Sequence, residues 1–158
     1  MANSSLGEGA KLFKRFTCLF LVIVAIFASS SLPGKVSHGQ STALVKLVLT
    51  NQQQITPRSV YVIGFIMRKL AHLTEFIVLA IALAFALNLD QWNSLGCIND
   101  LIKKMFVIFL SGLFLASSDE FYQLLVPGRI FDINDVYIDA TGVVLGLLIT
   151  SHRAKKLR

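Results

Sequence analysis

The sequence predicts an all-α, polytopic membrane protein with four transmembrane helices. Of its 158 residues 54% are hydrophobic and 15% are charged, with a mean hydropathy of +0.67, whereas about 25% of residues are charged in soluble domains. Four mostly apolar runs approach the roughly 20 helical residues that cross a bilayer. Turn-forming residues separate these runs, at Pro33-Gly34, Asn93 to Gly96 and Pro127-Gly128.

The four helices are expected at residues 12–32, 69–89, 104–125 and 133–151. The first includes a charge-free run from Phe16 to Leu32, without the polar face that a soluble helix would need. Residues 1–11 and 152–158 are then short tails of a membrane domain at 12–151. The basic start, apolar stretch and small residues at 28–30 also fit a cleavable signal peptide, whose removal would leave three helices.

The distribution of Lys and Arg predicts that both termini are cytoplasmic in a cell-membrane protein. Three basic residues lie at 11–15, two in the loop at about 90–104 and four at 153–158, whereas Arg129 is the single one between the third and fourth helices. The connection at 33–67 is expected outside, with 43–49 and 59–67 apolar enough to lie along the interface. Because the basic clusters flank apolar runs, we expect membrane lipids as partners and no nucleic acid.

Polar residues converge at three helix ends that alternating passes place on the same side of the membrane. Ionisable groups within membrane segments are costly, at roughly 2.5–3.5 kcal/mol for the bilayer centre, and are functional candidates by default. A solvated structural cluster is the alternative. We name these residues the polar cluster: Lys69, His72, Glu75, Asp119, Glu120, Gln123, Arg129, Asp135 and Asp139.

Helical spacing predicts that the polar cluster lines a pocket, because residues three and four apart share a face. Asp135 and Asp139 share a face with Gly142 and Gly146, and Gly112 lies on the face of Asp119. Small residues let membrane helices approach closely, so these three glycines are predicted packing positions below an outward-opening polar pocket.

Cys18 and Cys97 show no disulfide or metal-binding spacing. No cofactor is expected, although a divalent cation at the carboxylates stays open.

Several segments together resemble the signature of the VanZ-like family of small bacterial integral membrane proteins. They are the D-E-F-Y-Q run at 119–123, the P-G-R at 127–129 and the D-V-Y-I-D-A-T-G run at 135–142. Residues 69–72 are similar to the family's K-x-x-H element, and residues 29–34 to its serine-rich element. The resemblance covers about residues 12–150, with Tyr122 where histidine is frequent and Asp139 where asparagine is an alternative. It implies a bacterial envelope role in resistance to teicoplanin, a lipid-tailed glycopeptide antibiotic acting outside the membrane.

Four functions remain open from the residues. The first is binding of a lipid-anchored envelope ligand, such as a lipid-linked cell-wall precursor or a lipoglycopeptide, with Arg129, Arg68 and Lys69 holding its phosphate or carboxylate. The second is a membrane-embedded enzyme acting on a lipid-linked phosphate, although the sequence has no nucleophile elbow, no H-E-x-x-H and no phosphate loop. The third is a small proton-coupled efflux component, although transporter sites usually lie nearer the midplane. The fourth is a structural partner protein. Neither oligomeric state nor ligand identity follows from the sequence.

Overall fold

The computed structural model describes residues 2–33, 39, 43, 56–88 and 98–156. In these residues the chain forms helices α1 (Ala2–Ser30), α3 (Pro57–Ala86), α4 (Ile98–Gln123) and α5 (Ile133–Lys156), and no strand. Each of the four helices contains a segment long and apolar enough to span a membrane. The prediction of an all-α, four-helix membrane protein is confirmed.

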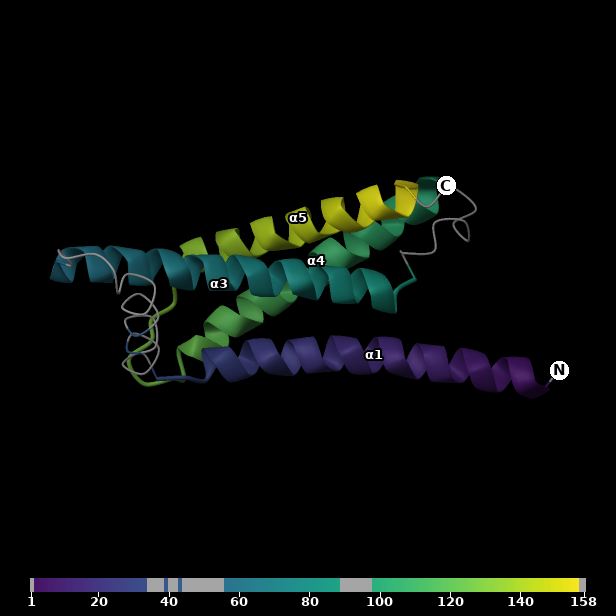
Figure 1. Ribbon diagram of the computed structural model, residues 1–158, viewed down its shortest axis with the longest axis horizontal. Helices are drawn as coiled ribbons and strands as arrows, with labels where there is room; N and C mark the ends of the chain where they lie inside the picture. Colours follow the sequence, from purple (N-terminus) through teal and green to yellow (C-terminus); the bar gives the residue numbers. More distant parts are fainter. Residues whose placement is uncertain (1, 34–38, 40–42, 44–55, 89–97, 157–158) are drawn as a thin grey trace.

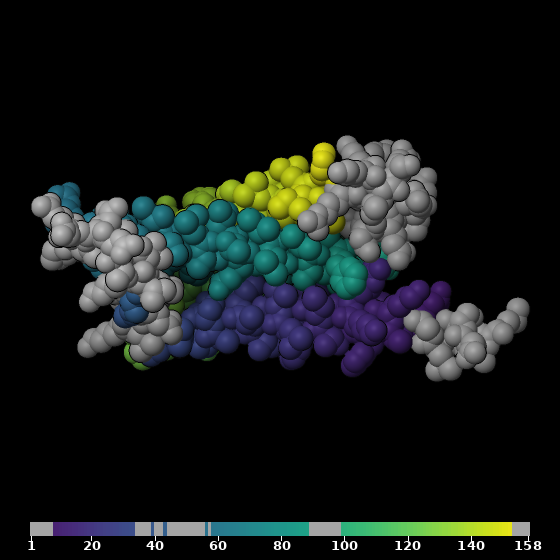
Figure 2. Space-filling view, in the orientation of Figure 1, coloured from purple at the N-terminus to yellow at the C-terminus, as the bar shows by residue number. Residues whose placement is uncertain are grey.

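The four helices lie lengthwise beside one another and form an elongated bundle (Figure 1). Helices α3 and α5 make the most extensive contact, α4 crosses obliquely against them, and α1 lies along α3. The space-filling view shows α1 in close contact with α3 (Figure 2). Helix α1 begins and α5 ends at one end of the bundle. We call the opposite end, where α1 and α4 end and α5 begins, the polar end.

Helix α3 begins twelve residues before the expected start at 69, which corrects that boundary. Thr56 caps the helix by accepting a hydrogen bond from the backbone N–H of Ser59 at 3.2 Å, and Pro57 occupies the first turn. Both features favour a helix start. Residues 59–67 therefore form the first turns of α3, which project beyond the start of α5 (Figure 1). Positions 34–38, 40–42 and 44–55 of the expected outer loop, and Cys97, lie outside the described residues.

The other helix boundaries also differ from those expected by a few residues. Helix α1 includes most of the expected tail at 1–11, α4 begins at Ile98 rather than 104, and α5 continues beyond 151 to Lys156. Helices α3 and α4 end at Ala86 and Gln123 rather than at 89 and 125. Hydropathy locates the part of a helix that lies in lipid, whereas backbone hydrogen bonding continues into charged flanks.

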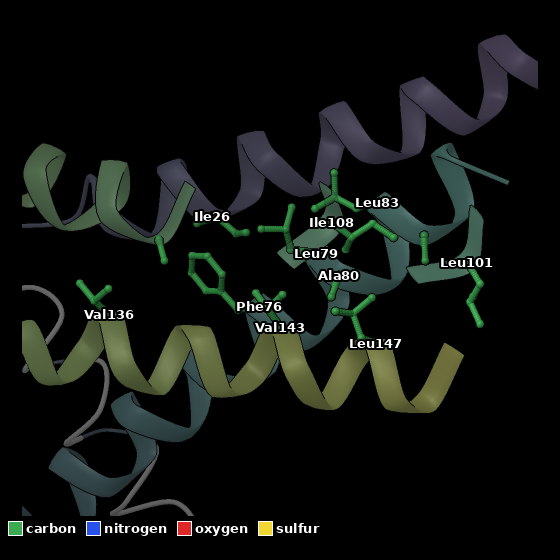
Figure 3. Packing of buried hydrophobic residues seen from close by; sticks show 12 residues of the cluster. Ile26, Phe76, Leu79, Ala80, Leu83, Leu101, Ile108, Val136, Val143 and Leu147 are labelled. Carbon is green, nitrogen blue, oxygen red and sulfur yellow. The ribbon is translucent and has the colours of Figure 1, made fainter. Parts of the chain in front are cut away.

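The apolar core lies between α3, α4 and α5, and α1 contributes from one side. Phe76, Leu79, Ile108 and Val143 are fully buried, and Figure 3 shows their side chains among those of the core, with Ile26 reaching in from α1. Large apolar side chains also cover the outer surface, as expected where a bundle faces lipid. The core therefore fixes the helices against one another through close packing rather than through exclusion of water.

Three glycines allow close packing between helices, and two of them, Gly142 and Gly146, bring helix backbones into direct contact. A Cβ atom at Gly142 would lie 2.7 Å from the carbonyl oxygen of Leu73, and one at Gly146 would lie 2.7 Å from the carbonyl oxygen of Ile77. At Gly112 an added Cβ would lie 2.6 Å from Val143 Cγ2. Any side chain at the first two positions would therefore push α5 away from α3.

We expect Gly142→Ala and Gly146→Ala each to lower the free energy of unfolding by about 1–3 kcal/mol, because the neighbouring atoms are backbone and Cβ atoms that cannot move aside cheaply. Thermal unfolding of the purified protein in detergent micelles measures this. Gly9→Ala is the control, because nothing lies within 4 Å of its added Cβ and alanine favours a helix over glycine. Equal stability of all four proteins would show that the close α3–α5 contact is unimportant.

Candidate functional site

A charged network lies at the surface of the polar end. Lys69 Nζ on α3 donates a hydrogen bond to Asp132 Oδ2 at 2.9 Å and forms a second ion pair with Asp135. Arg129, in the turn between α4 and α5, donates from Nη1 to Gln123 Oε1 at 3.0 Å. Its Nε donates to the carbonyl oxygen of Leu32 at 3.4 Å. These contacts connect the start of α3, the turn and the chain after α1.

A second, buried network lies on the last turns of α4. Asp119 and Glu120 are fully buried, and Gln123 Nε2 donates to Asp119 Oδ2 at 2.9 Å and to Glu120 Oε1 at 3.3 Å. Ser30 Oγ at the end of α1 donates to Asp119 Oδ2 at 2.8 Å. The backbone N–H of Asp132 donates to Glu120 Oε2 at 2.9 Å. The α4 carboxylates therefore hold both α1 and the turn before α5.

His72 and Asp139 meet between α3 and α5, next to the buried network. His72 Nδ1 lies 3.6 Å from Asp139 Oδ1, and Asp139 is fully buried. Four buried atoms find no hydrogen-bond partner among the described residues: His72 Nδ1, Asp119 Oδ1 and both carboxylate oxygens of Asp139. An unsatisfied buried polar atom costs about 1–3 kcal/mol, and more when it is charged. Four buried polar atoms without hydrogen-bond partners in three neighbouring residues therefore need a physical explanation.

A cavity of about 290 Å³ lies at the polar end, beside these networks. Three cationic side chains, those of Arg68, Lys69 and Arg129, line it together with His72. Its remaining lining residues are Tyr61, Phe65, Gln123, Gly128, Ile130, Asp132 and Asp135. The fully buried carboxylates are absent from this lining. The cavity wall therefore carries three cationic side chains and two carboxylates, those of Asp132 and Asp135, and both carboxylates are paired with Lys69.

Glu75 is separated from the cavity. Its Oε1 accepts a hydrogen bond from Ser29 Oγ of α1 at 3.0 Å. It lines an apolar groove of about 500 Å³ between α1 and α3, together with Ile26 and Met67. The structure thus brings eight residues of the polar cluster around the cavity and the buried network, and turns Glu75 toward α1.

Besides Arg68, predicted from the sequence as an anion-binding residue, four contributing residues lie outside the polar cluster. Tyr61 and Phe65 line the cavity, Ser30 holds Asp119, and Asp132 pairs with Lys69. Tyr61, Phe65, Arg68 and His72 are separated by four, three and four residues, which is the spacing of one helix face. Extending the stripe backward along α3 would therefore have found both aromatic residues. The role of Ser30 depends on a contact between distant segments, which spacing alone does not reveal.

The chain matches the family model described as VanZ/LLP1 over residues 16–154. The matched region contains the cavity, the charged network and the buried network. No curated protein and no solved structure matches the chain.

Asp132 provides a pH-dependent contact in the turn outside the membrane-spanning segments. The hydrogen bond from Lys69 lowers the pKa of Asp132 below its ordinary value, with further help from Asn134. A lowered native pKa stabilises the fold above the ordinary aspartate pKa of about 3.9, and this stabilisation is lost as the pH falls through the lowered value.

We therefore expect Asp132→Asn to lower the melting temperature at pH 7 by no more than about 4 °C, the range for a partly exposed ion pair. The difference from wild type should disappear as the pH falls through the native pKa. Melting curves between pH 2 and 7 test this, with exposed Asp100→Asn as the control. A difference that stayed constant down to pH 2 would contradict the pairing.

Proposed function

This chain belongs to the VanZ/LLP1 family, and we propose that it binds a lipid-anchored or lipophilic ligand of the cell envelope at its polar end. The ligand places an anionic group, a phosphate or a carboxylate, in the cavity. Arg68, Lys69 and Arg129 carry this proposal, because three cationic side chains line one cavity at the end of an apolar bundle. Lipid-linked cell-wall precursors and lipoglycopeptides such as teicoplanin have the required chemistry.

Arg129 is the principal anion-binding residue in this proposal. Its guanidinium carries five N–H donors in a planar fork that fits phosphate or carboxylate. The contacts of Nη1 with Gln123 and of Nε with Leu32 orient this group without involving a carboxylate. Lys69 is already paired with Asp132 and Asp135, so it contributes less of its charge to an incoming anion.

Apolar side chains around the cavity provide a path for the ligand's lipid tail. Leu125, Ile130 and Tyr137 are highly exposed, at 79%, 81% and 67%. They lie on the same turn and helix start as the charged network, so an acyl or prenyl chain contacts them while its head group enters the cavity. Burial of apolar surface contributes about 25 cal/mol per Å².

The polar end faces the outside of the cell in this proposal. The basic residues at 11–15 and 153–156 belong to the opposite end of the bundle, where α1 begins and α5 ends. Positively charged flanks favour the cytoplasmic side. A ligand site at the outer leaflet also suits a role in glycopeptide tolerance, since these antibiotics act on precursors outside the membrane.

We expect Arg129→Ala to weaken binding of a labelled lipid-linked cell-wall precursor, or of teicoplanin, by about tenfold or more, the scale of a lost charged hydrogen bond. Arg129→Lys should retain part of the affinity, because it keeps the charge but loses the fork. Binding is measured on purified protein in detergent, and teicoplanin tolerance on cells with matched membrane levels of each variant. Exposed Arg58→Ala, on α3 but outside the cavity lining, is the control.

Wild-type affinity and tolerance in Arg129→Ala would contradict this function.

A membrane-embedded enzyme acting on a lipid-linked phosphate is the second candidate, favoured by the meeting of His72 and Asp139 beside the cavity. Mass spectrometry of the precursor after incubation with the protein separates the two functions. We expect binding without a change in mass, and a product of altered mass would favour the enzyme.

A further inference from the structure

We propose that His72, Asp119 and Asp139 form a binding site for one divalent transition-metal ion, of the Zn²⁺ or Mn²⁺ type. The three side chains come from α3, α4 and α5 and converge where these helices meet. One imidazole nitrogen and one oxygen from each carboxylate all lie within 4.8 Å of one another. His72 Nδ1 and Asp139 Oδ1 are 3.6 Å apart.

The unpartnered atoms of these same residues point to a cation rather than to a purely structural cluster. Asp139 is fully buried, and neither of its oxygens has a hydrogen-bond partner among the described residues. Asp119 Oδ1 and His72 Nδ1 are likewise buried and have no hydrogen-bond partner among the described residues. Protonating His72 would supply a single N–H at Nδ1, and Asp119 Oδ1 and the second Asp139 oxygen would then need a further proton shared between the two carboxyl groups. A metal ion satisfies atoms of all three residues at once.

The surroundings orient Asp119 as a ligand. Ser30 Oγ and Gln123 Nε2 both donate to its Oδ2, at 2.8 and 2.9 Å, so Oδ1 is the oxygen left for His72 and Asp139. Carboxylates that bind metals are commonly held in this way by hydrogen bonds to the other oxygen. Gln123 also contacts Glu120, which ties the proposed site to the buried network.

The donor set selects the class of ion. An imidazole nitrogen with two carboxylate oxygens suits Zn²⁺ or Mn²⁺, whereas Mg²⁺ and Ca²⁺ prefer oxygen ligands alone. Ligands bound at about 2.1 Å lie at most about 4.2 Å apart, so small side-chain rotations bring these atoms into range. Three protein ligands leave a coordination position for water or another ligand. His72 also lines the cavity, which supplies an access route.

Metal titration of the purified, tag-free full chain in detergent tests this site without any lipid ligand. After treatment with a chelator, isothermal calorimetry with Zn²⁺, Mn²⁺, Mg²⁺ and Ca²⁺ measures affinity and stoichiometry. We expect one equivalent of Zn²⁺ or Mn²⁺ to bind in preference to Mg²⁺ and Ca²⁺. A hundredfold excess over the dissociation constant should raise the melting temperature by about 5–10 °C.

Asp139→Asn and His72→Gln should each raise the dissociation constant for the metal at least about a hundredfold. Removing a residue that only supports a metal ligand already lowers metal affinity by about 10–100-fold. Exposed Asp100→Asn and His152→Gln are the matched controls and should bind like wild type. Asp139→Asn also removes one side of the buried His72–Asp139 pair, which lowers the stability of the protein without metal. If it fails to fold, His72→Gln provides the test.

The proposed site is overturned by no binding of Zn²⁺ or Mn²⁺, by preference for Mg²⁺ or Ca²⁺, or by wild-type metal affinity in a folded His72 or Asp139 variant. Arg129→Ala distinguishes this failure from failure of the proposed function. It should lose affinity for the anionic ligand and keep its affinity for metal, because Arg129 is not among the three ligands.

Discussion

The contact between the backbones of α3 and α5 is the constraint on which the rest of the structure depends. Gly142 and Gly146 leave no room for a side chain between these helices, and close packing is what holds helices together where the surrounding lipid is equally apolar. Asp139 lies three residues before Gly142, so the same face that packs on α3 carries a carboxylate into the interface. That carboxylate meets His72. Burial of the ionisable groups thus follows from the glycine contact.

Polar contacts hold both ends of the bundle, through carboxylates at one end and an arginine at the other. At the polar end, Asp119 and Glu120 join α1 and the turn before α5 to α4. At the opposite end, buried Arg15 donates to the carbonyl oxygen of Phe85 at 2.7 Å, with its guanidinium over the Phe85 ring. An ion held by His72, Asp119 and Asp139 would add positive charge next to the cavity that Arg68, Lys69 and Arg129 line. The proposed anion and metal sites would therefore reinforce each other.

The fold was largely predictable from the sequence, apart from helix boundaries. Long apolar runs and turn residues determine four membrane helices, because a segment that crosses a bilayer must satisfy its backbone hydrogen bonds internally. The start of α3 was missed because hydropathy reports the apolar length needed for crossing, whereas the helix begins at a local cap formed by Thr56 and Pro57. Alternating passes then place the polar ends of α3, α4 and α5 together. That convergence follows from topology before any packing is known.

Only the tertiary structure decided which polar residues share a site. Positions three apart along a helix differ by about 60° around its axis, so the spacing of His72 and Glu75 placed both on one broad stripe. In the structure α1 packs on one side of α3 and α5 on the other. Glu75 therefore contacts Ser29 of α1, whereas His72 contacts Asp139 of α5. Nor does the sequence reveal which carboxylate oxygens have no hydrogen-bond partner. The sequence determined the types of chemical group at the polar end, because they are local, whereas their partners depend on the angles at which the helices meet.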